Sequence, residues 1–266
     1  MPAPGWIPRL VALDVDGTLL DPQTQTISTP VRAAVRRVAE SGAHVVIATG
    51  RSMFGTVPVL AELGLGSGVA LCSNGAVTLD AATGEALAVE TFDPAPVHAR
   101  LAALLPGAIF AAEQLGTGSL VTSPFREHQL HGPQRLTDLD ELVSAPVPRL
   151  IANWEDREPH AVAEALAGVE LPGCTTTIDH YEPWVTVVPD GVTKGSALEK
   201  LRTELGVAAE DTFAAGDGTN DVQMLAWAAH GVAMGQAPAE VHAAAIEVTG
   251  TVTEDGIVHA LARWFG

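Results

Sequence analysis

The stretch that most constrains the fold is a short apolar run that leads directly into an acidic turn, LVALDVDGTLL at residues 10–20. A four-residue apolar run closed by such a turn indicates a buried strand of a parallel sheet. Parallel sheets bind ligands just beyond the carboxyl ends of their strands, so we expect Asp14 and Asp16 to project into one crevice. At about 4 Å and an effective dielectric of about 20, their repulsion is on the order of 4 kcal/mol. A fold tolerates that repulsion when a cation is bound or one carboxyl stays protonated. The alternative is an ordinary Asx-type turn, which Asp and Gly favour in any case.

The composition bounds the class of protein. The chain has 266 residues, long enough for one large domain or two smaller ones, and it is 47% hydrophobic and 17% charged, as in globular proteins. Lys and Arg number 14 against 32 Asp and Glu, a formal net charge of −18. This balance disfavours nucleic acid and anionic membrane surfaces as partners. A small anionic substrate stays possible, because a bound metal ion can reverse the sign of the local charge.

Targeting and redox signals are weak. Cys72 and Cys174 are far apart and form no metal-ligand or redox pattern, so we expect them to act as small buried hydrophobes. The first residues show no signal-peptide pattern, and no apolar run is long enough for a membrane helix. We therefore expect a cytoplasmic protein.

Short apolar runs alternate with helical patterns through the first 80 residues. Thr29-Pro30 is typical of a helix start, and apolar runs follow at 44–48 and 69–72. These two runs end in Thr49-Gly50-Arg51 and in Ser73-Asn74-Gly75. Strands and helices that alternate at this spacing predict a doubly wound parallel α/β sheet. The polar clusters then lie at the strand ends, where such sheets bind ligands.

The rhythm of the sequence changes after about residue 80. Pairs of short strands with interspersed helices predict an antiparallel α+β unit, which we assign to residues 81–189 as an inserted domain. The first pattern resumes at Lys194-Gly195 and includes a strand closed by Gly216-Asp217-Gly218. We therefore assign residues 1–80 and 190–266 to one α/β domain, whose two halves build a single crevice.

Four polar clusters occur in a fixed order: DVDGT at 14–18, TGR at 49–51, KG at 194–195 and GDGTND at 216–221. Their order resembles the haloacid dehalogenase (HAD) superfamily of aspartate-nucleophile phosphotransferases, whose motifs are DxDGTL, a Thr or Ser, a Lys, and GDxxND. The TGR and SNGA forms, with a large insert after the third strand, look most like the Cof-type sugar-phosphate phosphatases. The motifs match within about 1–80 and 190–266, whereas the insert matches by position and length only. The resemblance implies an α/β fold: a HAD-like Rossmannoid parallel sheet core with an inserted α+β cap domain.

The resemblance also implies a division of catalytic roles. Asp14 would be the nucleophile that becomes an aspartyl-phosphate, and Asp16 would protonate the leaving alcohol and then activate water. A covalent intermediate divides one very slow hydrolysis into two easier steps, and a positioned acid–base group assists both. Lys194 would neutralise charge on the phosphoryl group and the nucleophile. Thr49 and the amide of Gly50 would hold phosphoryl oxygens.

A metal ion follows from the charges. A phosphate dianion that approaches Asp14, Asp16, Asp217 and Asp221 would be repelled by all four, and Mg²⁺ prefers carboxylates, substrate oxygens and water as ligands. The resemblance assigns Mg²⁺ to the Asp14 side chain, the Asp16 backbone carbonyl and Asp217, with Asp221 nearby. Asn220 would orient this network through hydrogen bonds.

Several residues keep two interpretations. Arg51 either binds substrate or pairs with an acid at the rim of the crevice. Asn74 and Gly75 either form only a turn with positive φ or, as their strand-end position favours, lie beside the substrate. Asp221 is either a metal-site residue or the first-turn acid of a helix at 220–229, stabilised by the helix dipole.

The insert is expected to close over the core, exclude water and contact the substrate. Polar and aromatic residues in the loops of such an insert are more often surface or packing groups than substrate contacts. We expect His128 and His131, three residues apart with no further ligand cluster, to be solvated, and Trp154 and Trp184 to pack in the cap core. The candidate cap contacts are Arg126, His128, His131, His180, Tyr181, Glu182 and Trp184.

The leading hypothesis is a Mg²⁺-dependent phosphatase of a small phosphorylated metabolite, with a sugar phosphate preferred. The alternatives are a phosphomutase with a related cap, a specialised glycoside-phosphate phosphatase, and a catalytically idle binding protein. The intact set of nucleophile, acid–base, lysine and metal residues argues against the idle protein, and the second aspartate argues against a dehalogenase. We expect a monomer or a small homo-oligomer, with no nucleic-acid or membrane partner.

Overall fold

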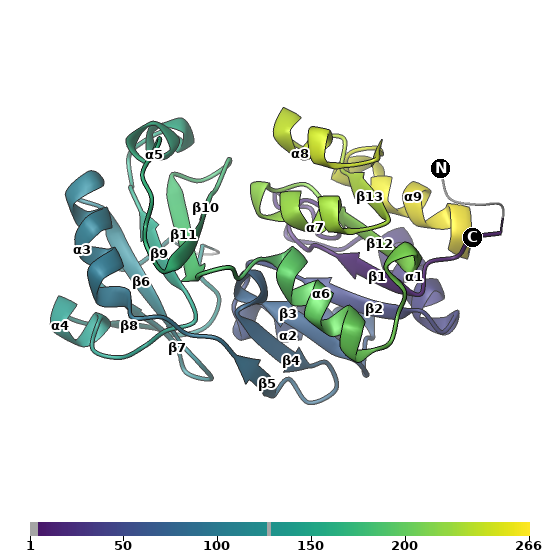
Figure 1. The fold of residues 1–266 in the computed structure, drawn as a ribbon, viewed down its shortest axis with the longest axis horizontal. Coiled ribbons are helices and arrows are strands. Elements are labelled where there is room, and N and C mark those ends of the chain that lie inside the picture. Colours follow the sequence, from purple (N-terminus) through teal and green to yellow (C-terminus); the bar gives the residue numbers. More distant parts are fainter. Residues whose placement is uncertain (1–4, 127–128) are drawn as a thin grey trace.

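The computed structural model describes residues 5–126 and 129–266, and within these residues the strands form one eight-stranded and one six-stranded sheet (Figure 1). The larger sheet has the order β14-β13-β12-β1-β2-β3-β4-β5. Neighbours from β14 to β3 are parallel, whereas β3–β4 and β4–β5 are antiparallel. Its strands are β1 (Leu10–Leu13), β2 (His44–Ala48), β3 (Val69–Cys72), β4 (Val77–Asp80), β5 (Ala86–Val89), β12 (Thr212–Gly216), β13 (His230–Ala233) and β14 (Glu247–Val248).

Helices cover both faces of the larger sheet. On one face lie α1 (Thr29–Glu40), α2 (Met53–Leu63) and α9 (Gly256–Phe265), and on the other α6 (Lys194–Glu204), α7 (Val222–Trp227) and α8 (Ala239–Ala244). Side chains alternate along β1: Val11 and Leu13 pack with the first group of helices, and Leu10 and Ala12 with the second. This alternation explains why β1 is an uninterrupted apolar run, and it confirms the doubly wound α/β prediction.

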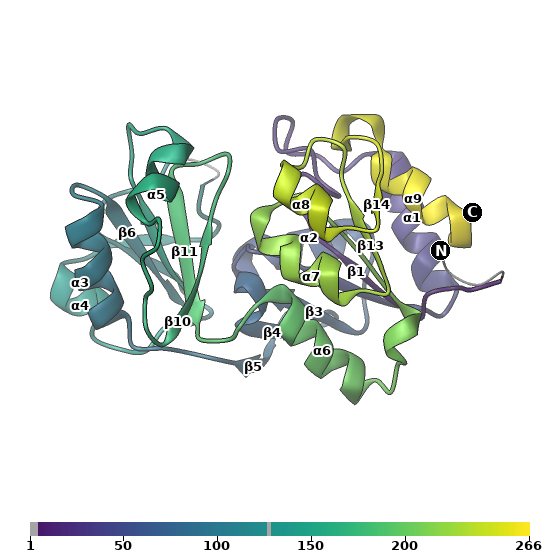
Figure 2. The same cartoon turned by 45° about the horizontal axis from the view of Figure 1, so that its top comes forward.

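The smaller sheet has the order β10-β11-β9-β6-β7-β8. Its neighbours are antiparallel except for β7 and β8, which are parallel. Three helices pack on one face, and Figures 1 and 2 show α3 and α4 on the side away from the larger sheet. The elements are β6 (Ile109–Gln114), β7 (Gly118–Val121), β8 (Gln134–Leu136), β9 (Leu150–Asn153), β10 (Cys174–Ile178), β11 (Trp184–Pro189), α3 (Pro94–Leu104), α4 (Leu139–Leu142) and α5 (Pro159–Ala165).

The two faces of the smaller sheet have different tasks. In β11, Val185 and Val187 pack under the helices, whereas Trp184 and Thr186 line a cavity that the smaller sheet shares with the ends of the larger one. Trp154 packs against the apolar cluster under the helices, as expected. Trp184 packs against a second apolar cluster and also reaches the cavity, so its role is wider than the predicted packing role.

Two expectations need correction. The boundary that we placed between residues 80 and 81 cuts through a hairpin, because β5 pairs with β4 and extends the larger sheet. The change of rhythm at this point marks the change from parallel to antiparallel pairing, not the end of the sheet. Strand β8 was not expected: its three residues are all exposed, so no apolar alternation signals it.

The remaining expectations concern burial. Cys72 is buried as predicted, and Cys174 is partly buried against the apolar cluster of the smaller sheet. Among residues 5–126 and 129–266, no helix has the length and apolar character needed to cross a membrane.

Candidate functional site

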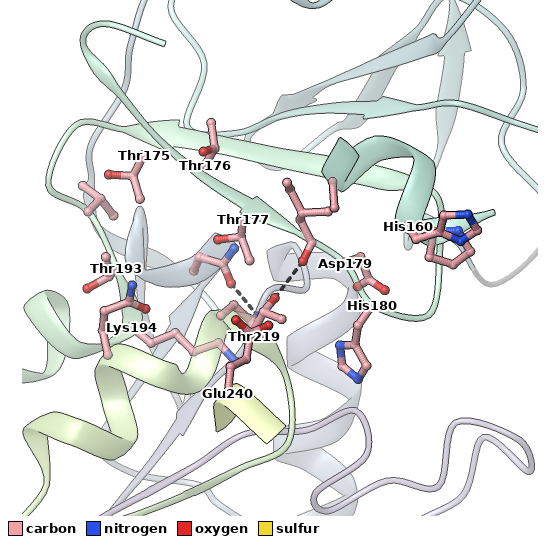
Figure 3. A pocket seen from close by; sticks show the side chains of 17 residues that line it. His160, Thr175, Thr176, Thr177, Asp179, His180, Thr193, Lys194, Thr219 and Glu240 are labelled. Carbon is pink, nitrogen blue, oxygen red and sulfur yellow. Dashed lines mark hydrogen bonds between the residues drawn. The ribbon is translucent and has the colours of Figure 1, made fainter. Parts of the chain in front are cut away.

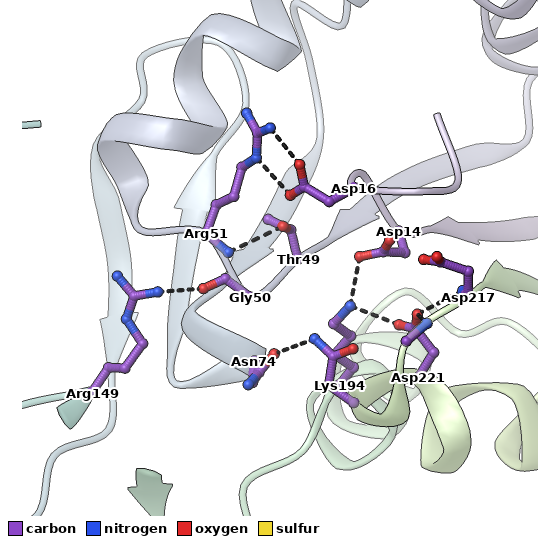
Figure 4. Close-up of polar contacts among 12 residues, drawn as sticks. Asp14, Asp16, Thr49, Gly50, Arg51, Asn74, Arg149, Lys194, Asp217 and Asp221 are labelled. Atoms are coloured by element: carbon purple, nitrogen blue, oxygen red, sulfur yellow. Dashed lines mark hydrogen bonds and ion pairs between the residues drawn. The ribbon is translucent and has the colours of Figure 1, made fainter. Parts of the chain in front are cut away.

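The loops that follow β1, β2, β3 and β12 meet at one edge of the larger sheet (Figure 4). Asp14 and Asp16 follow β1, Arg51 follows β2, Asn74 follows β3 and Asp217 follows β12. The strands β12, β1, β2 and β3 are adjacent and parallel, so their carboxyl ends lie side by side. The topology therefore brings together residues from both halves of the chain, as the interrupted sequence pattern predicted.

Lys194 is the centre of the site. It is the first residue of α6, its side chain is fully buried, and Thr193 caps the helix by accepting a hydrogen bond from the Ser196 amide. The Lys194 Nζ atom lies 2.7 Å from Asp14 Oδ1 and 2.6 Å from Asp221 Oδ1. A lysine without water around it needs such carboxylate partners. Although burial opposes its charge, Asp14 and Asp221 outweigh that effect and raise the pKa of Lys194, so it stays protonated.

Asp221 organises the loop after β12. Its Oδ2 atom accepts hydrogen bonds from the amides of Asp217 (3.0 Å) and Gly218 (2.9 Å), while Oδ1 binds Lys194. Asp221 is also the acidic residue of the short 3-10 turn Thr219–Asp221 that leads into α7, and the bond from the Gly218 amide closes a capping box there. Because its other oxygen binds Lys194, the interpretation of Asp221 as only a helix-end acid is wrong.

Three buried carboxylates surround this single ammonium group. Asp14, Asp217 and Asp221 each offer an oxygen, and the three oxygens lie within 4.8 Å of one another. Burial, with Asp221 as a second cause, raises the pKa of Asp217 to about 7, and burial and Asp221 also raise the pKa of Asp14 well above its ordinary value. The cluster thus carries more negative charge than Lys194 offsets. An all-oxygen set with surplus negative charge fits a hard divalent cation.

Asp16 and Arg51 form a separate pair at the edge of the site. The Arg51 Nε atom donates to Asp16 Oδ2 at 2.7 Å, and a second guanidinium nitrogen donates to Oδ1. The Asp16 side chain is 44% exposed, in contrast to the buried Asp14. Of the two interpretations of Arg51, the structure shows the ion pair. The repulsion between Asp14 and Asp16 is offset by two different cations, Lys194 and Arg51.

Gly17 allows the turn after β1 to approach the loop after β12. Its φ is +84°, and a Cβ atom at this position would lie 2.1 Å from Asp217 Oδ2. Gln236, in the loop after β13, donates to the Gly17 carbonyl at 2.6 Å and to Asp217 Oδ2 at 3.1 Å. Gln236 therefore fixes the orientation of the Asp217 carboxylate, and our sequence analysis missed it. The signal was available, because Gln236 follows a strand end as the other site residues do.

Some of the remaining predicted residues line a cavity and others do not. Asn220 Nδ2 donates to Asn74 Oδ1 at 2.9 Å, and both side chains and Gly50 line a cavity. Thr49 is buried and accepts a hydrogen bond from the Arg51 amide, and it is not among the lining residues.

Gly75 also lies away from the cavities that the described residues form. Its φ is +99°, and a Cβ atom there would lie 2.8 Å from the Thr193 carbonyl oxygen, so the close approach to α6 requires glycine. The interpretation of Gly75 as a turn residue agrees with the structure, and the substrate-side interpretation does not.

A cavity of about 770 Å³ lies between the two sheets and contains this site. Asp14, Asp16 and Asp217 line its core side, and Trp184, Thr186 and the loop between β10 and β11 line its cap side. In that loop, Asp179 Oδ1 accepts hydrogen bonds from the amides of Tyr181 and Glu182. The loop so fixed places the Tyr181 hydroxyl 3.4 Å from Asp217 Oδ2. Burial, followed by the charge of Asp217, raises the pKa of Tyr181 to about 12, so its hydroxyl keeps its proton.

A smaller adjoining cavity of about 480 Å³ lies between β10 and the start of α6 (Figure 3). Thr175, Thr177 and His180 line it from the cap, and Lys194 and Thr219 from the core. The Thr219 hydroxyl donates to the Ile178 carbonyl at 2.7 Å, which fastens β10 to the loop after β12. His180 reaches both cavities, and burial lowers its pKa, so the imidazole is neutral near pH 7.

A buried ion pair joins the cap to the core at the other side. Arg149 Nε lies 2.9 Å from Glu113 Oε2, and both side chains are more than nine-tenths buried. Glu113 also accepts a hydrogen bond from the Ser73 hydroxyl at 2.6 Å, and Arg149 donates to the Gly50 carbonyl. Both cap residues thus form hydrogen bonds with the loops after β3 and β2, which carry residues of the candidate site. Neither residue was predicted to belong to the site, because neither is part of a local motif.

Most of the expected cap contacts line the larger cavity, but Arg126 does not. Arg126 lies at the surface near Glu155 and Asp156, away from the cavity. His128 lies outside the described residues. His131 is half-buried, packs close to Gly55 and lines the larger cavity, so the expectation that it is solvated is wrong. The other candidates also line that cavity: His180, Tyr181, Glu182 and Trp184.

Comparison with known proteins identifies the family. The chain matches the haloacid dehalogenase-like hydrolases over residues 11–261. Because this match covers almost the whole chain, the protein belongs to that family. The Cof-type assignment and the phosphatase class predicted from the motifs are confirmed by the relatives.

Two curated relatives and one solved structure illustrate the likeness. The HMP-PP phosphatase of Serratia proteamaculans (strain 568) is 29% identical, over 96% of this chain and 95% of its own. Phosphatase YwpJ of Bacillus subtilis (strain 168) is also 29% identical, over 95% of this chain and 98% of its own. The solved structure of BT1666 from Bacteroides thetaiotaomicron, described among phosphatases of the haloalkanoate superfamily, is 26% identical. It superposes with a TM-score of 0.79 and covers 99% of this chain and 97% of that one.

Proposed function

We propose that the protein is a Mg²⁺-dependent phosphatase that hydrolyses a small sugar phosphate through an aspartyl-phosphate on Asp14. The observation that carries the proposal is the position of Asp14, which is buried at the cavity wall with Oδ1 held by Lys194. One carboxylate oxygen is thereby oriented, and the other has no hydrogen-bond partner among the described residues. An oriented carboxylate that faces a cavity is suited to nucleophilic attack on phosphorus.

In the first step, an Asp14 oxygen forms a bond to phosphorus while the bond from phosphorus to the leaving oxygen breaks. Asp16 lines the same cavity; once it has exchanged its contact with Arg51 for a proton from solvent, it would deliver that proton to the leaving alkoxide. In the second step, water attacks phosphorus, Asp16 takes its proton, and the bond to Asp14 breaks. Lys194 would hold the nucleophile and offset developing charge in both steps.

Asp14 and Asp217 would hold Mg²⁺, with Asp221 beside them. When bound, this ion would supply positive charge. That charge would offset the repulsion between the four carboxylates and a phosphate dianion that approaches them. Asn74 and Asn220, hydrogen-bonded to each other at the cavity wall, would position phosphoryl oxygens. The cavity between the cap and the core would limit access of bulk water to the first step.

The test is release of inorganic phosphate from a panel of sugar phosphates, nucleotides, flavin mononucleotide and pyridoxal phosphate. We expect turnover of sugar phosphates that requires Mg²⁺, stops with a chelator, and is lost in Asp14→Asn without loss of folding. Substantial metal-dependent turnover by Asp14→Asn would remove Asp14 as the nucleophile. Absence of release from every compound, together with a trapped phosphoenzyme, would favour a phosphomutase.

A further inference from the structure

The larger cavity has an unusual balance of charge for a site that takes a phosphate ester. Six of its described lining residues are acidic, namely Asp14, Asp16, Asp21, Asp179, Glu182 and Asp217, whereas its Lys and Arg residues are Arg51 and Arg149. Asp14, Asp16 and Asp217 belong to the proposed catalytic machinery. Asp21, Asp179 and Glu182 have no role in the proposed catalysis and add negative charge to the same cavity.

The cations around the two cavities already have partners. Arg51 holds Asp16, Arg149 holds Glu113, and Lys194 holds Asp14 and Asp221. Within residues 5–126 and 129–266, no Lys or Arg side chain that lines either cavity lacks a carboxylate partner. A second anionic group on the substrate would therefore meet carboxylates without a free lysine or arginine to receive it. Taking such a group out of water without a counter-charge is costly.

Glu182 is the cap residue that best explains why the cavity would disfavour a second anionic group. Its Oε2 atom accepts a hydrogen bond from Gln129 Nε2 at 2.9 Å, and Asp179 fixes its amide. The side chain is half-buried in the cavity wall, and its neighbour Tyr181 reaches Asp217. Glu182 is thus held in the cavity wall by neutral contacts, and among residues 5–126 and 129–266 it has no Lys or Arg partner. A held carboxylate accepts hydrogen bonds from hydroxyl or ammonium groups and repels anions.

We propose that the cavity selects phosphate monoesters whose leaving group is a neutral polyol or carries an amine, and that Glu182 rejects leaving groups with a second anionic group. This inference rests on the proposed function, and it specifies the substrate class that the same site accepts. It predicts discrimination by charge between compounds that share one sugar ring.

The experiment compares kcat/KM for glucose 6-phosphate, glucosamine 6-phosphate and glucose 1,6-bisphosphate at saturating Mg²⁺. We expect the bisphosphate to be at least about tenfold poorer than glucose 6-phosphate, which corresponds to about 1.4 kcal/mol of transition-state free energy. Glucosamine 6-phosphate should equal or exceed glucose 6-phosphate. Either phosphate of the bisphosphate could be released, which can only raise its measured kcat/KM. This effect would make the expected difference from glucose 6-phosphate smaller, not larger.

Glu182→Gln keeps the size of the side chain and its contact with Gln129 but removes the charge. We expect this variant to reduce the discrimination against the bisphosphate at least about fivefold and to lower the relative rate with glucosamine 6-phosphate. The matched control is Glu164→Gln, on the exposed surface of α5 and away from both cavities, which should leave the ratios unchanged.

Two outcomes overturn the inference while leaving the phosphatase intact. One is a wild-type enzyme that hydrolyses the bisphosphate as well as glucose 6-phosphate. The other is a Glu182→Gln variant whose ratios shift no more than those of Glu164→Gln. Absence of Asp14-dependent release from all three compounds would instead contradict the proposed function.

Discussion

At the scale of single residues, the surplus of negative charge around Lys194 decides how the site responds to pH. Asp14, Asp217 and Asp221 are all buried, and one ammonium group offsets only part of their charge. The native state without metal therefore keeps a proton on this cluster in a range of pH where the unfolded chain has lost it. Stability must then depend on pH in the direction set by that extra proton.

We predict that the metal-free protein loses stability as the pH rises from about 4 to about 7. The pKa of Asp217 is raised by burial and by Asp221 from 3.8 to about 7, so the native state binds more protons than the unfolded state in this window. Each such proton lowers the free energy of unfolding by at most about 1.4 kcal/mol per pH unit. Urea unfolding at pH 5, 6 and 7 in a chelator measures the slope, and Mg²⁺ should stabilise the protein more at pH 7 than at pH 5.

A control is needed because the net charge of the whole chain also becomes more negative over the same pH range, and this could change the stability as well. Asp217→Asn should flatten the slope, whereas Asp140→Asn, at an exposed position of α4, should leave it unchanged. Equal slopes in the wild type and in Asp217→Asn would mean that Asp217 has no raised pKa in the native state.

The structure brings the central residues of the candidate site together, and there is a physical reason why the sequence could predict this. Asp14, Asp217 and Lys194 each stand next to the end of a strand or the start of a helix, so topology alone brings them together. The pair of Asp16 with Arg51 could not be chosen over substrate binding, because it depends on the direction of two side chains. Gly75 was misplaced for the same reason, since its role comes from an approach to α6 that the sequence does not show.

At the scale of elements, Glu113 of β6 and Arg149, which directly precedes β9, contact the loops after β3 and β2. The alternation along β6 places Glu113 on the same face as Ala111, opposite to the helices. The partners of the two side chains, Ser73 and the Gly50 carbonyl, are parts of the core that border the proposed site. The position of two strands is thereby coupled to the geometry of two loops that carry candidate site residues.

We predict that Arg149→Met lowers the free energy of unfolding by about 3–5 kcal/mol, because Glu113 would remain buried without its cation. The double variant Glu113→Gln, Arg149→Met should be less destabilised than the sum of the two single variants, since it leaves no buried charge unpaired. Urea unfolding of the three variants gives the coupling, and Arg135→Met, which removes an exposed arginine from the same sheet, should leave the unfolding midpoint unchanged. Strictly additive single variants would contradict the proposed coupling.

The elements themselves were predictable to the extent that their pattern is local. The parallel strands β1, β2, β3 and β12 have apolar runs, and the sequence located each of them. Strand β5 was assigned to the inserted domain, although it pairs with β4 in the larger sheet, because antiparallel pairing looks the same at an edge of either sheet. The contacts of Glu113 and Arg149 join residues far apart in the chain, and no local pattern reports them.

At the scale of the whole molecule, the net charge of −18 opposes the approach of any phosphate ester. Proteins that bind anions commonly attract them over long distances, whereas this chain repels them until they reach its proposed metal site. The repulsion acts through solvent, so dissolved salt screens it. The screening length falls from about 30 Å at 0.01 M salt to about 8 Å at 0.15 M.

We therefore predict that kcat/KM for glucose 6-phosphate rises several-fold when KCl increases from 10 to 150 mM at constant, saturating Mg²⁺, while kcat stays unchanged. The rise should be confined to kcat/KM because screening changes the approach of the substrate, and the buried contacts of Lys194 with Asp14 and Asp221 lie beyond the reach of salt. Replacing KCl by potassium acetate separates this effect from specific binding of chloride. If kcat/KM fell steadily with both salts, the substrate would be attracted over long distances, and local positive charge would have to dominate the field of the whole molecule.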